Sequence, residues 1–333
     1  MMKLSVLDQS PVSEGSTPRE AILQTTELAK EVERLGYKRF WVSEHHFTKK
    51  LAGSSPEVLM AHLASHTSHM RIGSGGVMLP HYSPYKVAEN FRLLETLYPG
   101  RIDAGMGRAP GGMPISTYAL QEGRLSNYQD YPRKLDELIA YLHDALPETH
   151  RYKGLKATPI PEQPPEIWLL GSSGESARLA AERGAAFAFA QFINGEGGEE
   201  VVQQYKRSFV PSIVGETPSV LVSIFVICAD TTEEAEKIAS SLDLSLLILE
   251  NGMPSNGIPS IETAQAYNYS YFEALRVKEN RKRMIVGNPQ QVKEQMMALS
   301  KAYETDEFMV VTITHDFAHK LRSYQLLAEV FQL

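Results

Sequence analysis

Residues 167–190 read IWLLGSSGESARLAAERGAAFAFA, and this stretch decides the fold. A short apolar run, Ile167–Leu170, leads into a turn of glycine and serine. A segment of helical period follows and ends at Gly184, and a second apolar run, Ala186–Ala190, comes after it. Short buried strands that alternate with helices are typical of βα units in a parallel sheet.

The same alternation extends along the whole chain of 333 residues. The apolar runs that we predict as strands are Leu4–Leu7, Arg39–Ser43, Arg71–Met78, Ile102–Gly105, Ile167–Leu170, Ala186–Ala190, Ser219–Ala229 and Phe308–Thr312. A helical candidate follows each of them, and the first begins at Thr17-Pro18-Arg19-Glu20, a capping box with proline at the first helical position. Eight such units predict an α/β fold, the (β/α)8 TIM barrel with insertions. We expect residues 1–333 to form one barrel domain.

Two stretches exceed what a barrel of about 250 residues needs. One is Tyr152–Glu166, which is rich in proline, and the other is Asp243–Lys282, between the seventh and eighth predicted strands. The second contains the turn residues Asn251–Gly257, flanked by helical segments. Because a long insertion at the active end of a barrel is often a lid, we expect a lid at about 243–282. An inert surface excursion is the alternative.

Composition and charge exclude several classes of partner. The chain has 33 Lys+Arg against 40 Asp+Glu, a net charge of −7, and no clustered basic run, which argues against nucleic acid or anionic membrane. Cys228 is the one cysteine, so a disulfide framework and a multi-cysteine metal site are excluded. The N-terminal residues lack a signal peptide's apolar region, and no apolar run approaches the roughly 18 residues of a membrane span. We therefore expect a cytoplasmic protein.

Polar residues follow the second and third predicted strands, at the end of a barrel where reacting groups lie. After the second strand comes Glu44-His45-His46-Phe47, in which a histidine can act as acid or base near neutral pH. A structural histidine or a metal ligand is the alternative. The third strand contains Gly75-Gly76, which allows a flat ligand to approach the backbone closely or marks a bulge.

Two later strand ends suit a phosphate group. Arg108 lies among small residues and is able to contact an anion with both guanidinium nitrogens, unless it is an ordinary surface arginine. Gly171–Ser176 leads directly into a helix and offers N–H groups, hydroxyls and a positive helix end, although a plain serine cap would use the same residues. Taken together, the strand ends predict a site for a phosphate joined to a planar group.

These residues resemble the bacterial luciferase-like flavin monooxygenases. Glu44–Thr48 is similar to the family's EHHF segment, and Arg71–Pro84, Tyr98–Arg108 and Trp168–Asn194 match three of its strand blocks. The resemblance implies a (β/α)8 barrel that binds FMN without a covalent bond, as FMNH2 supplied by a separate flavin reductase. It also implies O2 and a small organic substrate as partners, and a homodimer.

The resemblance assigns roles position by position. It implies that His45 is catalytic and that a non-prolyl cis peptide between Gly75 and Gly76 lies beneath the flavin ring. It implies phosphate binding by Arg108 and the helix start, and contacts with the ring edge after the sixth strand. The cofactor-binding residues that it implies are Gly75, Gly76, Arg108, Ser172, Ser173, Gly174, Ser176, Ala188 and Gln191.

Three positions depart from the luciferase α subunits. Gly107 stands where they have a cysteine, Ser172 replaces a glutamate, and Gln191 replaces a large aromatic residue. These departures argue against light emission but leave the oxygen chemistry in place.

We therefore expect an FMN-dependent monooxygenase that acts on an unidentified small organic substrate. The alternatives are a flavin- or deazaflavin-dependent reductase on the same barrel, a metal-dependent barrel hydrolase, and a flavin-binding protein without catalysis. We predict no metal site: His62, His66 and His69 share one helical face but lack a neighbouring carboxylate or cysteine, so we expect them to be partly buried packing residues.

Overall fold

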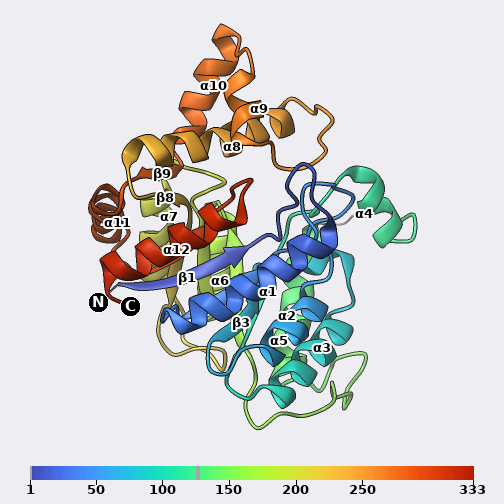
Figure 1. Ribbon diagram of the computed structural model, residues 1–333. Coiled ribbons are helices and arrows are strands. Elements are labelled where there is room, and N and C mark those ends of the chain that lie inside the picture. Colours follow the sequence, from blue (N-terminus) through green and yellow to red (C-terminus); the bar gives the residue numbers. More distant parts are fainter. Residues whose placement is uncertain (1, 125–127) are drawn as a thin grey trace.

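The computed structural model describes residues 2–124 and 128–333, and its strands form a closed parallel barrel (Figure 1). The barrel strands are β1 (Lys3–Asp8), β2 (Arg39–Val42), β3 (Arg71–Ser74), β5 (Ile102–Gly107), β6 (Glu166–Gly171), β7 (Ala186–Ala190), β8 (Val220–Cys228) and β10 (Glu307–Val311). Each strand pairs with the next, and β10 closes the ring by pairing with both β8 and β1. These strands correspond to the eight predicted ones, so the predicted (β/α)8 fold is confirmed.

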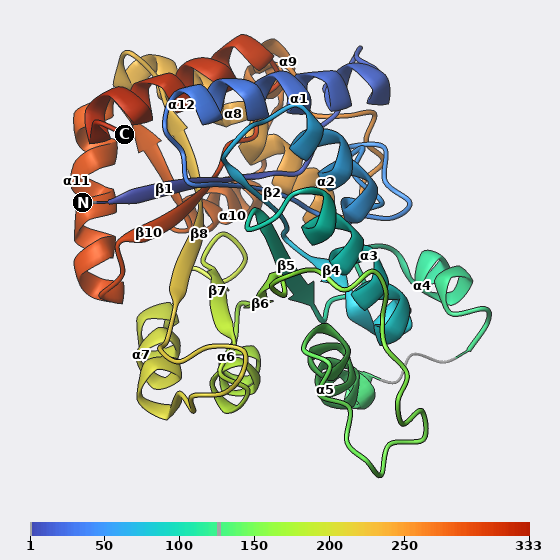
Figure 2. The same cartoon turned by 90° about the horizontal axis from the view of Figure 1, so that it is seen from below.

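Helices surround the strands on all sides (Figure 2). The helices around the barrel are α1 (Pro18–Arg34), α2 (Pro56–Ser65), α3 (Pro84–Leu97), α5 (Tyr131–Leu142), α6 (Gly174–Glu182), α7 (Gly198–Ser208), α8 (Thr232–Glu250), α11 (Pro289–Tyr303) and α12 (Phe317–Phe331). Sequence signals explain their ends: α1 begins at the predicted capping box, in which the Thr17 hydroxyl accepts the Glu20 N–H and the Glu20 carboxylate accepts the Thr17 N–H.

The third predicted strand is divided into two. The peptide bond between Gly75 and Gly76 is cis, as the resemblance implied, and separates β3 from β4 (Val77–Met78). Both pieces pair with β5, so they continue the same side of the barrel wall. β3 and β4 therefore form one barrel strand that is interrupted at the Gly75–Gly76 peptide.

Two further elements were not predicted, β9 (Met284–Gly287) and α4 (Pro114–Leu120). β9 lies outside the barrel ring and pairs with the second half of β8, from Phe225 to Cys228. The first half of β8 pairs with β10 instead. The nine-residue strand β8 therefore pairs with two strands, β10 in the barrel wall and β9 beside it.

The predicted insertion starts inside a helix. α8 continues through Asp243 to Glu250, and α9 (Ile261–Ala266) and α10 (Tyr271–Arg281) follow it above the barrel strands in Figure 1. Arg281 of α10 donates to both carboxylate oxygens of Asp243, at 2.6 and 2.7 Å. Farther along, Ile258 exchanges backbone hydrogen bonds with residues 12 and 14 of the loop after β1. In the part of the chain that the structure describes, no helix combines the length and apolar character needed to cross a membrane.

A buried ionic cluster fills the N-terminal end of the barrel. Arg39, the first residue of β2, donates to the carboxylates of Asp103 and Glu307 at 2.7 to 3.0 Å. Although burial opposes ionisation, the charges of Arg39 and Arg71 hold the pKa of Asp103 below its usual value. Above this layer the rings of Trp41 and Trp168 meet edge to face, with centroids 5.4 Å apart. The barrel is therefore closed at this end, and a ligand reaches its interior from the other.

Candidate active site

A cavity of about 540 Å³ lies at the C-terminal ends of the barrel strands. It brings together residues that follow β2, β3, β5, β6 and β7. The predicted site residues that line it are His45, Gly75, Gly76, Arg108, Ser172, Ser173, Ser176 and Ala188. The structure thus gathers most of the predicted site on one rim, although the residues come from distant parts of the sequence.

Gly174 and Gln191 do not line this cavity. Gly174 is the first residue of α6 and lies between the lining residues Ser173 and Ser176. Gln191 is buried and bonded elsewhere: its Oε1 accepts from the hydroxyl of Tyr303 on α11, and its Nε2 donates to a backbone oxygen at 3.3 Å. Phe192 and Ile193, the next two residues of the loop, line the cavity where the side chain of Gln191 was expected.

The two histidines after β2 are held differently. Glu44, only 1% exposed, accepts the Tyr82 hydroxyl and the Met78 N–H at 2.7 and 2.8 Å. The Nε2 atom of His46 lies 2.7 Å from the same carboxylate. Glu44 therefore orients His46 and ties the end of β2 to β4, while it leaves His45 free to face the cavity.

His45 and Glu44 are the ionisable side chains of this segment that line the cavity, and of the two histidines only His45 does. Its Nε2 atom lies 3.3 Å from the amide Nε2 of Gln9, which lines the cavity too. Burial and, secondarily, the nearby His46 lower the pKa of His45 to about 4. At neutral pH the imidazole is therefore uncharged and able to accept a proton.

The glycines on the rim are packed tightly against protein atoms. A Cβ at Gly76 would lie 2.8 Å from the carbonyl oxygen of Gly105 on the neighbouring strand, and one at Gly75 would lie 2.7 Å from a methyl carbon of Leu7. A Cβ at Gly107 would meet the methyl carbon of Met78 at 2.7 Å. The contact at Gly76 is with backbone, which cannot move aside, so strand packing itself disfavours a larger residue there, whereas the side chains of Leu7 and Met78 can shift. The glycines leave this wall of the cavity as bare backbone.

Another part of the cavity, at the ends of β5 and β6, suits an anion. Among the residues that the structure describes, no side chain or backbone group pairs with Arg108. Ser173 caps α6 without a side-chain hydrogen bond to the helix, so the hydroxyl and the first N–H groups of α6 remain available. Glu175 at this helix start has a lowered pKa, chiefly through its bond to Arg178 and also through the charge of Arg108. Guanidinium, hydroxyls and a helix N-terminus together fit a phosphate group.

The rest of the lining is mostly apolar, with a few polar groups on one side. The apolar side chains are Leu7, Trp41, Met78, Leu170, Phe192, Ile193 and Met309. The polar ones are Gln9, Ser43, Glu44 and Ser223. Apolar walls, a glycine wall and one anion-binding end fit a flat ring that carries a phosphate tail.

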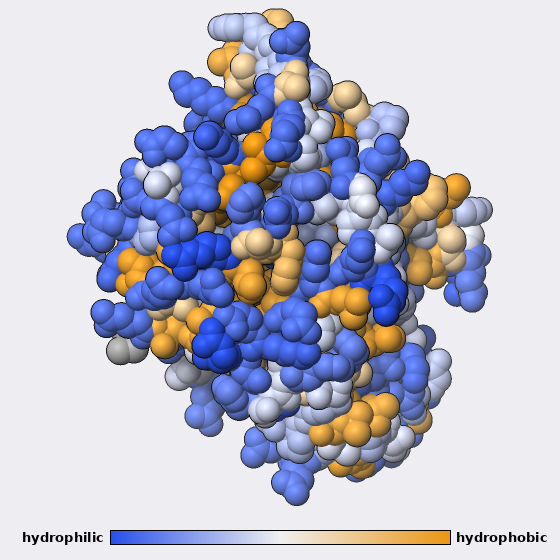
Figure 3. Space-filling view, in the orientation of Figure 1, coloured by the Kyte–Doolittle hydropathy of each residue, from blue (hydrophilic) through white to orange (hydrophobic). Residues whose placement is uncertain are grey.

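Hydrophobic side chains also gather beside the mouth. They lie over α4, at the right of Figure 3, in the segment that follows Arg108. Met113 and Ile115 of this segment are exposed by 59% and 66%.

The three histidines predicted to share one helical face do not pack as predicted, because α2 ends at Ser65 and His69 lies beyond it. His62, His66 and His69 are all exposed rather than packed, with the rings of His62 and His66 4.3 Å apart. The last buried residue of α2 is Ala64, and His66, which caps the helix, is already exposed. Across residues 2–124 and 128–333, no three His, Cys, Asp or Glu side chains form a group that would hold a metal ion.

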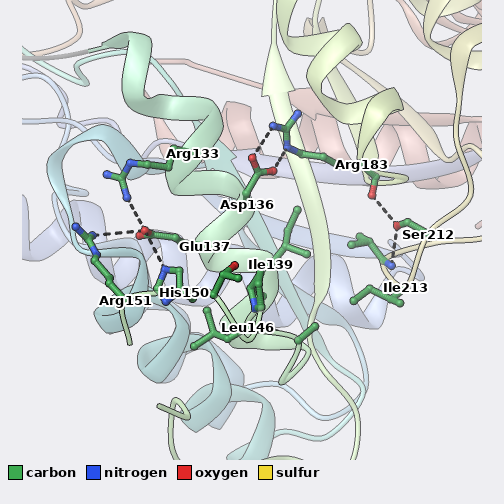
Figure 4. A pocket seen from close by; sticks show the side chains of 15 residues that line it. Arg133, Asp136, Glu137, Ile139, Leu146, His150, Arg151, Arg183, Ser212 and Ile213 are labelled. Carbon is green, nitrogen blue, oxygen red and sulfur yellow. Dashed lines mark hydrogen bonds and ion pairs between the residues drawn. The ribbon is translucent and has the colours of Figure 1, made fainter. Parts of the chain in front are cut away.

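A second cavity, of about 710 Å³, lies outside the barrel between α5 and residues 212–214 (Figure 4). Its charged groups pair with one another: Arg183 donates to Asp136 at 2.7 Å, and Arg133 donates to Glu137 at 2.6 Å. No predicted site residue lines it. The cavity at the strand ends is therefore the candidate active site.

Comparison with known proteins agrees with this geometry. The chain is 42% identical to the N-acetyl-S-alkylcysteine monooxygenase of Bacillus subtilis (strain 168), over 99% of this chain and 98% of that protein. The crystal structure of apo-MsnO8 superimposes with a TM-score of 0.90 at 36% identity and covers 100% of this chain and 99% of its own. The oxygenating constituent of 3,6-diketocamphane monooxygenase from Pseudomonas putida, solved in complex with FMN, shares the fold, with a TM-score of 0.71 at 19% identity over 99% and 97% of the two chains. The profile of the luciferase-like monooxygenases matches residues 2–305, and the chain belongs to that family.

Proposed function

We propose that this protein is a flavin-dependent monooxygenase that uses reduced FMN and O2 to oxygenate a small organic substrate. The observation that carries the proposal is that one cavity joins a glycine wall to an anion-binding end, which contains Arg108 and the start of α6. Membership in the luciferase-like monooxygenases supports the reaction class. The dimensions and chemistry of the cavity support FMN as the cofactor.

In this proposal the phosphate of FMN is bound by Arg108, the hydroxyls of Ser172 and Ser173, and the N–H groups of Gly174 and Ser176. The ring lies against Gly75, Gly76 and Ala188. When bound, reduced FMN supplies the reaction with O2. The protein orients it and excludes water, which the apolar lining of the cavity favours. Gln191 has no direct part, because its side chain is bonded to α11.

We assign His45 the transfer of a proton to or from the flavin or substrate. The lowered pKa of about 4 keeps the ring neutral at physiological pH, so Nε2, the nitrogen that accepts from Gln9, is the one that would take up a proton. Gln9 holds the imidazole from the neighbouring strand end. Glu44 is a positioning residue, since its carboxylate is hydrogen-bonded to His46, to Tyr82 and to the backbone of β4 and so holds the end of β2 in place.

The segment that contains α9 and α10 is proposed as the lid of a single barrel domain. Its turn at Gly257 packs against the backbone of residues 12–14, next to the loop that carries Gln9. At its other end Arg283 donates to the carbonyl of Ile193, a residue that lines the cavity. Both anchors therefore touch segments of the cavity rim. By family resemblance we also propose a cytoplasmic homodimer that receives FMNH2 from a separate reductase.

The substrate class is proposed from the relative at 42% identity, the N-acetyl-S-alkylcysteine monooxygenase of Bacillus subtilis. Small thioethers, including S-alkylated cysteine derivatives, are therefore the first substrates to test.

The cofactor proposal is tested by titrating FMN and riboflavin into the wild type, into Arg108→Ala and into Arg183→Ala as a control. Arg183, at the C-terminal end of α6, pairs with Asp136 and does not line the active cavity. We expect Arg108→Ala to weaken FMN binding about tenfold or more, because a charge-assisted contact is lost. Riboflavin, which has no phosphate, binds both variants as it binds the wild type.

Turnover is then measured with reduced FMN, labelled O2 and a series of thioethers. A monooxygenase incorporates one labelled oxygen atom into the product. Hydride transfer without oxygen consumption would identify a flavin- or deazaflavin-dependent reductase instead. Flavin binding without turnover of any compound would favour the non-catalytic alternative, and a wild type that binds no flavin would refute the proposal.

A further inference from the structure

Ser43 is a buried serine of the active cavity that neither the predicted site nor its mechanism uses. It follows β2 directly, precedes Glu44, and is 4% exposed. Within the described part of the chain, its Oγ atom has no hydrogen-bond partner. Trp41, on β2, and Ser43, two positions farther along, both line the cavity.

Comparison with other buried serines shows that a buried hydroxyl without a partner is not the rule in this molecule. The hydroxyl of Ser74, on the adjacent strand, donates to the Gly105 carbonyl at 2.8 Å and lies 3.0 Å from the Gly105 nitrogen. Ser241 on α8 also has an unpartnered Oγ, but it does not line the active cavity. Buried polar atoms in native proteins are normally satisfied, so an unsatisfied one that faces a cavity points to a ligand.

The position of Ser43 indicates which part of the ligand its hydroxyl would contact. The anion-binding end lies at the ends of β5 and β6, where Arg108 and the start of α6 are. Ser43 lies instead beside the glycine wall, since the N–H of Gly75 donates to the carbonyl of Val42 at 2.7 Å. The group bound next to Ser43 is therefore the ring and not its phosphate tail.

We propose that the Ser43 hydroxyl hydrogen-bonds to the polar edge of the flavin ring, where the ring carries carbonyl oxygens and N–H groups. This inference rests on the proposed function, because it takes the ligand to be a flavin. A hydroxyl both donates and accepts, so it is able to serve either kind of group. Ser43 is thus a cofactor-binding residue that selects for a ring with a polar edge.

The test compares Ser43→Ala with Ser241→Ala, since each removes one unpartnered buried hydroxyl and only Ser43 lines the cavity. The measurements are the Kd for FMN, the Kd for riboflavin, and the melting temperature of the ligand-free protein. We expect Ser43→Ala to raise both Kd values about tenfold, because riboflavin has the same ring. The ligand-free melting temperature stays the same or rises, since the lost hydroxyl was unpaired. Ser241→Ala leaves both Kd values unchanged.

Each other result contradicts a defined part of the argument. If the wild type binds neither FMN nor riboflavin, the proposed function itself fails. If the wild type binds flavin and Ser43→Ala binds it equally well, only the role of Ser43 is refuted. A loss of affinity for FMN but not for riboflavin would move the contact to the phosphate tail and overturn the assignment to the ring. A ligand-free Ser43→Ala protein that melts well below the wild type would show that the hydroxyl is structural.

Discussion

The amide Nε2 of Gln9 lies 3.3 Å from Nε2 of His45. An amide nitrogen only donates, so this imidazole nitrogen accepts, and the neutral ring carries its proton on Nδ1. The two residues follow β1 and β2, which pair in parallel with Asp8 opposite Val42. The pairing of β1 with β2 therefore brings the amide of Gln9 next to the proposed catalytic histidine.

Replacing Gln9 by glutamate should raise the pKa of His45. A carboxylate at this position favours the charged imidazolium, whereas the amide and the burial of the site favour the neutral ring. The pKa is measured by NMR titration of the histidine ring. Gln9→Leu is the control, and it should keep the pKa low because the burial remains. An unchanged pKa in Gln9→Glu would show that the two side chains do not meet in solution.

The lowered pKa of His45 also predicts how stability depends on pH. The folded-state pKa is about 4 and the unfolded value is about 6.5, so between these values the unfolded chain binds a proton that the folded chain does not. This contribution to stability is complete above about pH 6.5 and is lost as the pH falls toward 4, at no more than about 1.4 kcal/mol per pH unit.

The measurement is urea unfolding of the wild type and of His45→Gln at several pH values from 7 to 4. The wild type should lose more of its free energy of unfolding than the variant over this range. Parallel pH profiles for the two proteins would mean that His45 does not change its protonation on unfolding.

The fold was predictable because its signals are local and repeated. Each barrel strand is a short apolar run, and caps such as Thr17–Glu20 mark the helices. The clustering of the site was predictable too, because parallel strands bring their C-terminal ends together. β9 was missed because its four residues, Met284–Gly287, give too short a pattern to separate from the helices beside it.

Side-chain directions at the strand ends were harder to predict. Ala188 and Ala190 both line the cavity, so strand alternation places Gln191 on the opposite face, toward Tyr303. Strand alternation in the sequence thus favours this direction for the Gln191 side chain, whereas the family resemblance implied a contact with the flavin ring. The partner of Glu44 was not predictable in this way, because its bond to His46 depends on how the loop after β2 folds.

Replacing Gly76 by alanine separates the two sequence interpretations of the glycine pair, tight chain packing and close approach of a flat ligand. The new Cβ would lie 2.8 Å from the Gly105 carbonyl oxygen, which is backbone and cannot move cheaply. We expect a loss of about 1–3 kcal/mol in the free energy of unfolding without ligand. Gly174→Ala is the control, because a Cβ there meets nothing within 4 Å. Urea unfolding of both variants checks this. Equal stability of the two variants, with FMN binding weaker in Gly76→Ala than in the wild type, would mean that the glycine serves the ligand rather than the barrel wall.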